Sequence, residues 1–354
     1  MTNVNQYGWK ALVGSAVGYA MDGFDLLILG FMLSAISADL NLTLAQSGSL
    51  VTWTLIGAVV GGIVFGALSD RYGRVRVLTW TIVLFAVFTG LCAIAQGYWD
   101  LLIYRTIAGI GLGGEFGIGM ALAIEAWPAK HRAKAASYVA LGWQVGVLAA
   151  ALLTPVLLPH IGWRGMFVVG IFPAFVAWYL RTRLHEPEIF SRKQTALSTQ
   201  KTSKLESFKL LIKDKATTKV SLGVVVLTSV QNFGYYGIMI WMPNFLSKQL
   251  GFSLTKSGLW TAVTVCGMMA GIWIFGRLAD RIGRKPSFLL FQLGAVISII
   301  TYSQLTYQTA MLVAGAFLGM FVNGMMGGYG ALMAEAYPTE ARATAQNVLF
   351  NLGR

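Results

Sequence analysis

The chain has 354 residues, of which 56% are hydrophobic and 12% are charged, and its formal net charge is +13. A mean hydropathy of +0.65 and long apolar runs exclude a soluble enzyme. The positive charge does not indicate nucleic-acid binding, because the basic residues gather in short turns between apolar runs. The only cysteines, Cys92 and Cys266, lie within apolar runs, so no disulfide framework, metal site or cofactor is expected.

The apolar runs predict membrane helices, because about twenty apolar residues cross a bilayer as a helix and an unpaired backbone cannot face lipid. In chain order, the expected spans are 11–37, 49–69, 77–97, 100–126, 135–158, 163–182, 220–246, 256–279, 287–304, 309–336 and an incomplete span from 343 onward. These runs predict an all-α membrane protein.

Basic turns alternate with nearly uncharged turns along the chain. The basic set comprises Lys10, 71–76, 130–134, 181–219, 277–285 and Arg342, whereas 41–49 and 302–308 carry almost no charge. The positive-inside rule therefore predicts a cytoplasmic N-terminus.

The one long polar connection predicts a cytoplasmic linker, 185–219, between an N-terminal half, 1–184, and a C-terminal half, 220–354. Within the linker, Leu205, Phe208, Leu211 and Ile212 fall at helical spacing between lysines. This spacing predicts a short helix lying on the anionic inner leaflet.

Two motifs recur with the same separation of 210 positions. The first copy of one motif contains Gly66, Asp70, Arg71, Gly73 and Arg74, and the second contains Gly276, Asp280, Arg281, Gly283 and Arg284. The turn at 125–133 returns as 335–343, and the small-residue pair Gly57 and Gly61 returns as Gly267 and Gly271. The shared offset indicates that a whole half was duplicated. We expect the glycine pairs to pack helices closely, within or across the halves.

The repeated motif suggests a gate. Asp70 stands at a membrane edge, where it can pair with the nearby arginines and with the positive N-terminus of a neighbouring helix. Such contacts would form in one conformation and break in the other, as alternating access requires. The alternative is a topology anchor with no switching role.

Four ionisable residues fall inside the predicted spans: Asp22, Asp25, Arg105 and Glu115. Each costs about 2.5–3.5 kcal/mol in hydrocarbon, so these residues should face a cavity or each other. Asp25 and Arg105 fall at similar depths, roughly 8 and 9 Å from the outer edge, so an Asp25 or Asp22 pair with Arg105 is expected. An acid that loses its cation takes up a proton because burial disfavours its charge. We predict proton coupling by Asp22, Asp25 and Glu115 and substrate-anion binding by Arg105; a structural polar role is the alternative.

The C-terminal half carries no charge at the positions that correspond to these four residues. It offers neutral polar and aromatic side chains instead. We predict substrate contacts from Gln231, Asn232, Tyr235, Tyr236 and Asn323, together with Gln144 of the N-terminal half. Ordinary helix packing is the alternative for the aromatic rings.

The paired halves and the repeated G-x-L-x-D-R-x-G-R resemble the major facilitator superfamily. Arg105 with Gly109, Gly111 and Gly113 is similar to a superfamily motif found mainly in proton-driven members. The stretches 22–25, 114–117 and 125–128 resemble the bacterial sialate, aromatic-acid and metabolite:proton symporters. The glycine run also satisfies G-x-G-x-x-G, but it lies within an apolar span rather than after a strand, so a nucleotide site is not expected.

The resemblance implies two six-helix repeats and proton-coupled symport of a small organic acid by a monomer in the lipid bilayer, with no nucleic-acid partner. By the repeat, the second half should finish near residue 394, so we expect a truncation within the eleventh helix and a chain that is inactive alone. The alternatives are a non-functional transporter remnant and an uncoupled facilitator.

Overall fold

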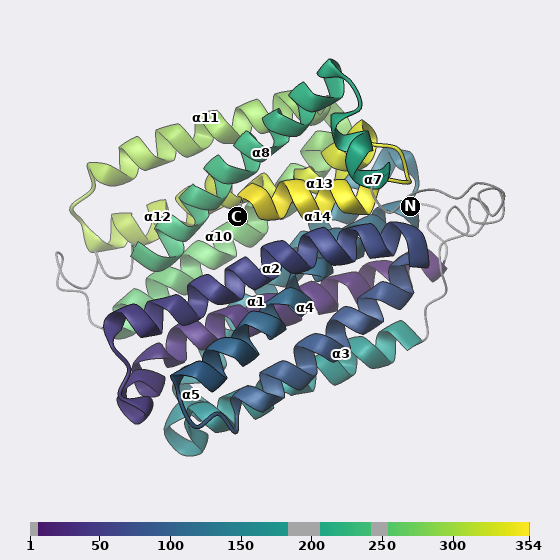
Figure 1. Ribbon diagram of the computed structural model, residues 1–354. Helices are drawn as coiled ribbons and strands as arrows, with labels where there is room; N and C mark the ends of the chain where they lie inside the picture. The colour runs from purple at the N-terminus through teal and green to yellow at the C-terminus, as the bar shows by residue number, and fades with distance from the viewer. Residues whose placement is uncertain (1–5, 183–205, 242–253, 354) are drawn as a thin grey trace.

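The computed structural model describes residues 6–182, 206–241 and 254–353, which form a bundle of helices with no strand among them (Figure 1). This confirms the all-α membrane class. The main helices are α1 (Gln6–Leu40), α2 (Leu44–Tyr72), α3 (Arg74–Cys92), α4 (Tyr98–Glu125), α5 (Arg132–Thr182), α8 (Lys215–Tyr236), α10 (Leu254–Ile282), α11 (Arg284–Ser303), α12 (Gln308–Gly324), α13 (Met326–Ala336) and α14 (Arg342–Gly353).

Within this described part, eight helices are long and apolar enough to cross a membrane. The boundaries follow the predicted spans closely, with two differences. The expected span 309–336 is divided at Met325 into α12 and α13. The expected fifth and sixth spans run together as α5, and only Gly162 leaves helical geometry, with φ of 65°. That left-handed conformation suits glycine, which has no Cβ to clash, so one residue reverses the chain.

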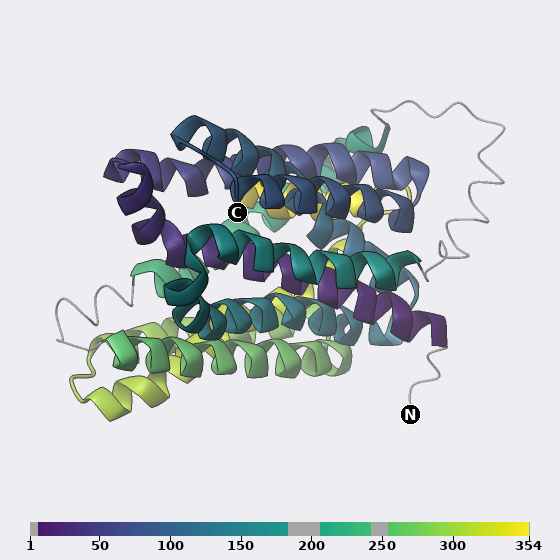
Figure 2. The same ribbon diagram turned by 90° about the horizontal axis from the view of Figure 1, so that it is seen from below.

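The helices run side by side, with α1 to α5 grouped together and α8 to α14 forming a second group (Figures 1 and 2). Helix α14 packs against α2 and α4, while α10 and α13 pack against α5. The turns at Gly73, Lys130, Gly283 and Pro338 all lie at one end of the bundle, which we call the basic end. The opposite end holds the weakly charged turns at 41–43 and 304–307.

The repeated glycines pack helices within each half rather than across the halves. A Cβ on Gly57 or Gly61 would strike the α4 carbonyls of Thr106 and Ile110. Gly267 and Gly271 meet the α12 carbonyls of Ala316 and Met320 in the same way, and these contacts keep the offset of 210 positions.

The described end of the linker forms α7 (Glu206–Lys209) and the 3-10 turn η2 (Leu210–Ile212). Ile212 is exposed, but Leu211 is buried and its carbonyl accepts a hydrogen bond from Ser221 of α8. The expected interfacial helix is therefore partly anchored on protein; Leu205 lies outside the described residues. Asp214 then caps α8, and the Thr217 N–H holds the pKa of Asp214 below its ordinary value.

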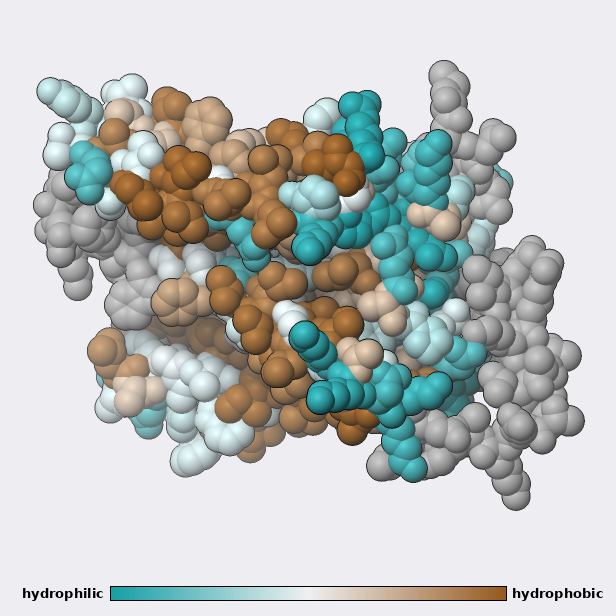
Figure 3. Space-filling model, turned by 90° about the horizontal axis from the view of Figure 1, so that it is seen from above, coloured by the Kyte–Doolittle hydropathy of each residue, from teal (hydrophilic) through white to brown (hydrophobic). Residues whose placement is uncertain are grey.

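Apolar side chains gather over the middle of the face shown in Figure 3, and hydrophilic ones lie mainly toward the basic end. Exposed apolar residues on α8 and α11 include Phe233, Leu293 and Ile297. This distribution suits a bilayer around the bundle, with the basic end in water.

Candidate functional site

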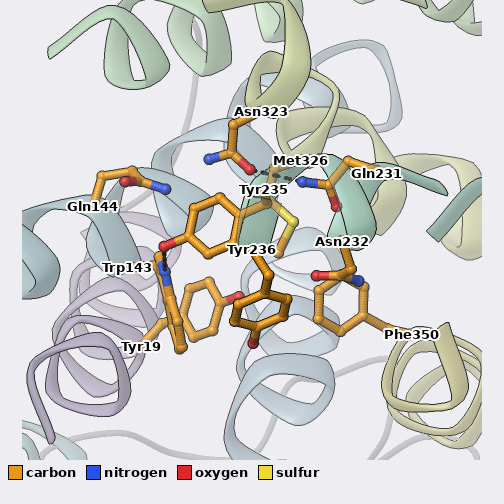
Figure 4. Close-up of a pocket in the computed structure, with 10 residues that line it drawn as sticks. All are labelled: Tyr19, Trp143, Gln144, Gln231, Asn232, Tyr235, Tyr236, Asn323, Met326 and Phe350. Carbon is orange, nitrogen blue, oxygen red and sulfur yellow. Dashed lines mark hydrogen bonds between the residues drawn. The ribbon is translucent and has the colours of Figure 1, made fainter. Parts of the chain in front are cut away.

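A small cavity lies between the two groups of helices (Figure 4). It is lined by Tyr19 of α1, Trp143 and Gln144 of α5, Gln231, Asn232, Tyr235 and Tyr236 of α8, Asn323 of α12, Met326 of α13 and Phe350 of α14. All ten lining side chains are uncharged.

The cavity brings together six residues that the sequence assigned to substrate contact: Gln144, Gln231, Asn232, Tyr235, Tyr236 and Asn323. Four further lining residues were not foreseen: Tyr19, Trp143, Met326 and Phe350. Tyr19 lies one turn before Asp22, and Trp143 directly precedes Gln144, so proximity to polar residues within a span was an available signal. Isolated rings in apolar spans are otherwise indistinguishable from packing residues.

Hydrogen bonds hold the cavity walls in place. Trp143 donates from Nε1 to the Tyr235 hydroxyl at 2.9 Å, which joins α5 to α8 across the two halves. Gln231 donates from Nε2 to Asn323 Oδ1 at 2.7 Å. Asn232 donates to the Thr228 carbonyl of its own helix at 3.0 Å.

The expected ion pair between the first and fourth helices forms with Asp25. Arg105 Nη1 donates to Asp25 Oδ1 at 3.1 Å, and Nη2 lies 2.8 Å from Oδ2, so the contact is bidentate. Both side chains are completely buried. Arg105 does not line the cavity. Its partner Asp25 lies six residues along α1 from the lining residue Tyr19, a distance of roughly 9 Å.

The other two acids predicted to couple protons are also buried. Asp22 lies on α1 one turn before Asp25. Glu115 of α4 accepts a hydrogen bond from the Thr81 hydroxyl at 3.4 Å. The structure thus distributes the three carboxyl groups over two neighbouring helices of the N-terminal half.

The first copy of the repeated motif joins the two halves at the basic end. Asp70 Oδ2 accepts from the backbone N–H of Thr344 at 2.9 Å and from its hydroxyl at 2.6 Å, at the start of α14. Asp70 Oδ1 pairs with Arg74 Nη1 at 2.6 Å. Gly73, with φ of 106°, provides the turn that brings Arg74 back beside Asp70.

The second copy makes the equivalent contact with α5. Asp280 accepts from the backbone N–H groups of Ala133 and Lys134 at 3.2 and 3.1 Å, and it pairs with Arg284 at 3.0 Å. Lys134 and Thr344 are themselves 210 positions apart, so each acid caps the equivalent helix of the other half. The macrodipole at a helix N-terminus favours such an acid.

The remaining motif arginines behave unequally. Arg71 and Arg281 are exposed, and Arg71 lies over the Tyr72 ring. Arg74 also reaches Glu125 at 3.3 Å and the Thr339 carbonyl at 3.0 Å, and Arg342 reaches Glu125 at 3.4 Å. Glu125 therefore adds a second, buried link between the halves, whereas its counterpart Glu335 is partly exposed and pairs with Arg284.

Two asparagines of α14 extend this closed region toward the cavity. Asn347 accepts from the Gly117 N–H at 3.1 Å, and Asn351 donates to the Gly113 carbonyl at 3.3 Å. The Phe116 ring of α4 packs on the Phe350 ring of α14, with centroids 4.2 Å apart. With the caps at Asp70 and Asp280, these contacts hold the two halves together at the basic end, so the structure represents a conformation closed at that end.

Known proteins of similar sequence include transporters, and the matching family model is one of transporters. A family model described as Major Facilitator Superfamily matches residues 15–354. The chain is 89% identical over 357 aligned positions to a Haemophilus influenzae protein for which metabolite transport is the proposed role, covering 100% of this chain and 88% of that one. It is 31% identical to the cis,cis-muconate transport protein of Acinetobacter baylyi, with coverage of 100% and 86%.

Among solved structures, the proton:xylose symporter XylE of E. coli, bound to 6-bromo-6-deoxy-D-glucose, superposes with a TM-score of 0.79 at 20% identity. The match covers 99% of this chain and 86% of that chain. At this identity the likeness concerns the fold, and it confirms the architecture expected from the repeated halves.

Proposed function

Because this chain belongs to the major facilitator superfamily, we propose that it is a secondary transporter that carries a small organic acid together with protons across the bacterial inner membrane. The observation that carries this proposal is the buried Asp25–Arg105 pair, whose Asp25 lies on the same helix, α1, as the cavity residue Tyr19 and roughly 9 Å along it. A membrane protein with a purely structural role would gain little stability from charges at that depth, because each charged side chain is costly in a membrane.

In this proposal Asp25 is the first site of proton uptake, with Asp22 and Glu115 as further carriers. Protonation of Asp25 leaves the Arg105 charge without its partner, so the two protonation states favour different arrangements of α1 and α4. The cavity residues hold the substrate, and Arg105 contacts a substrate anion only if movement brings it toward the cavity. This chemistry links proton binding to a conformational change.

The two copies of the repeated motif serve as the gate. Asp70 and Asp280 would release α14 and α5 when the basic end opens, and the Trp143–Tyr235 contact would change with the cavity. Acids that cap helices of the opposite half support this role better than a topology anchor, since an anchor needs no contact across the halves. The basic end faces the cytoplasm in this proposal, and the working unit is a monomer.

The relative that transports cis,cis-muconate supports an unsaturated organic acid as the substrate class. The test is uptake into proteoliposomes of a panel of labelled acids that includes cis,cis-muconate, with and without an imposed proton gradient. Accumulation above equilibrium that a protonophore abolishes is the expected result. Equilibration without accumulation would indicate an uncoupled facilitator, and no uptake of any acid would contradict the proposal.

A further inference from the structure

None of the ten side chains that line the cavity in the described part of the chain is a cation that could meet a carboxylate. Three buried amide atoms of the lining lack a hydrogen-bond partner: Gln144 Oε1, Gln231 Oε1 and Asn323 Nδ2. Each of these side chains is at most 3% exposed. As these amides are oriented, two acceptors and one donor are available to a ligand.

The Gln231–Asn323 pair offers one donor and one acceptor whichever way its amides are turned. As drawn in Figure 4, Gln231 donates to Asn323, which leaves Gln231 Oε1 and Asn323 Nδ2 available. Turning both amides over exchanges these roles and still leaves one free N–H and one free oxygen. The complementary ligand group therefore carries an acceptor and a donor side by side.

An ionised carboxylate does not have that pattern, because it only accepts hydrogen bonds. In this cavity it would oppose amide oxygens while its charge remained without a counterion, which is unfavourable in a low-dielectric interior. A protonated carboxyl group presents its carbonyl and its O–H together. It satisfies the amide pair without bringing a charge into the membrane.

The buried charged side chains outside the cavity lining already make other contacts. Arg105 of α4 is paired with Asp25 of α1, and Arg74 is paired with Asp70 at the basic end. Asp22 on α1 and Glu115 on α4 are further buried acids, which offer no positive charge to an anion. The titratable groups in the lining itself are tyrosine hydroxyls, which are uncharged at neutral pH.

We propose, on the basis of the transport function proposed above, that the cavity binds its substrate's carboxyl group in the protonated, uncharged form. The carboxyl O–H donates to the Gln231 or Gln144 oxygen, and the carbonyl accepts from Asn323. The rings of Tyr19, Tyr236 and Phe350 pack against a planar unsaturated body. The carboxylate takes its proton from solution before binding and returns it after release, so one proton accompanies each acid independently of Asp25.

The test compares benzoic acid with its uncharged analogue benzamide, by titration calorimetry on the purified full chain between pH 5 and pH 7. Benzoic acid, with a pKa of about 4, should lose about tenfold in affinity for each pH unit, because only its protonated fraction binds. The affinity for benzamide should not change. Equal benzoic acid affinity at both pH values, or no binding of either probe, would overturn the proposal.

Variants separate the substrate's proton from one carried by the protein. In Asp25→Asn the pH dependence of benzoic acid binding should persist, and its disappearance would contradict the proposal. Gln231→Met should weaken both probes about fivefold, whereas Gln304→Met, an exposed amide at the end of α11, should change neither. If these binding patterns hold but no acid accumulates in proteoliposomes, the transport proposal fails alone; if acids accumulate and binding ignores pH, only this inference fails.

Discussion

The Asp25–Arg105 pair is a completely buried, bidentate contact between α1 and α4. A buried ion pair adds little net stability, because desolvation offsets most of the attraction. Removing one partner destabilises the folded protein, since the other charge then stays buried without compensation. Loss of the bidentate contact would therefore leave Arg105 buried without its partner.

If Asp25 couples protons as proposed, Asp25→Asn removes the group that binds the coupled proton during the transport cycle. Accumulation driven by membrane potential in proteoliposomes should be lost, whereas exchange of labelled substrate across the membrane without a gradient should remain. The variant should also unfold at lower temperature, because breaking a buried pair costs about 3–5 kcal/mol. Accumulation equal to that of the unsubstituted protein would move the coupling role to Asp22 or Glu115.

At the scale of the helices, close approach depends on glycines that face backbone carbonyls. Gly61 of α2 stands directly against Ile110 of α4, while Gly48 of the same helix has nothing within 4 Å of its added Cβ. The two glycines share one helix but differ in surroundings. They form a matched pair for testing packing.

Gly61→Ala should destabilise the protein, because a methyl group would force α2 and α4 apart. Overpacking of this kind costs about 1–3 kcal/mol. Gly48→Ala should be neutral or stabilising by up to about 1 kcal/mol, since alanine favours the helix. Thermal unfolding in detergent measures both, and an equal melting temperature for the two variants would contradict the packing account.

In the proposed gate, the contact of Asp70 with α14 is one of the links that hold the basic end closed. Thr344→Ala removes the hydroxyl bond to Asp70 but keeps the backbone N–H bond. A hydrogen bond to a charged group contributes about 1.5–3 kcal/mol, so the population open at this end should rise about tenfold or more.

Electron paramagnetic resonance distances between spin labels at the exposed positions Lys130 and Arg281 would measure that opening, with Cys266→Ser as background. Thr52→Ala is the control, because its hydroxyl bonds only within α2 and is exposed. A distance distribution unchanged by Thr344→Ala would show that the hydroxyl does not hold the gate.

The molecule as a whole combines an apolar middle, a closed basic end and a cavity between the two groups of helices. All the cross-half ion pairs and helix caps discussed above lie at the basic end. If this end faces the cytoplasm, the structure represents the state that has not yet opened inward. The orientation of the bundle in the membrane therefore decides which step of the transport cycle this closed conformation represents.

Cysteine labelling tests the orientation in the Cys266→Ser background. A membrane-impermeant maleimide applied to intact spheroplasts should label Leu44→Cys, at the opposite end, and should label Lys130→Cys only after lysis. The positive-inside rule is the physical reason, since basic turns resist translocation. The reverse pattern would invert the proposed topology and the direction in which the gate is closed.

The sequence by itself determined the membrane class, the spans and the duplicated halves, because lipid acts on each apolar segment locally and a repeat is visible without packing. It also identified most polar residues of the cavity and the buried charges, since such residues stand out in apolar runs. It left open whether Asp22 or Asp25 meets Arg105, because residues three apart share a helix face. Only the tertiary structure decided this choice.

Tertiary packing likewise decided that Gly57 and Gly61 face α4 rather than the other half, and that Asp70 caps α14 through Thr344, 274 positions away. It placed Arg105 outside the cavity lining and added the rings of Tyr19 and Phe350 to it. The physical reason is the same in each case. Hydropathy and periodicity act along one helix, whereas a partner across the bundle depends on how helices rotate and pack together, which no local pattern specifies.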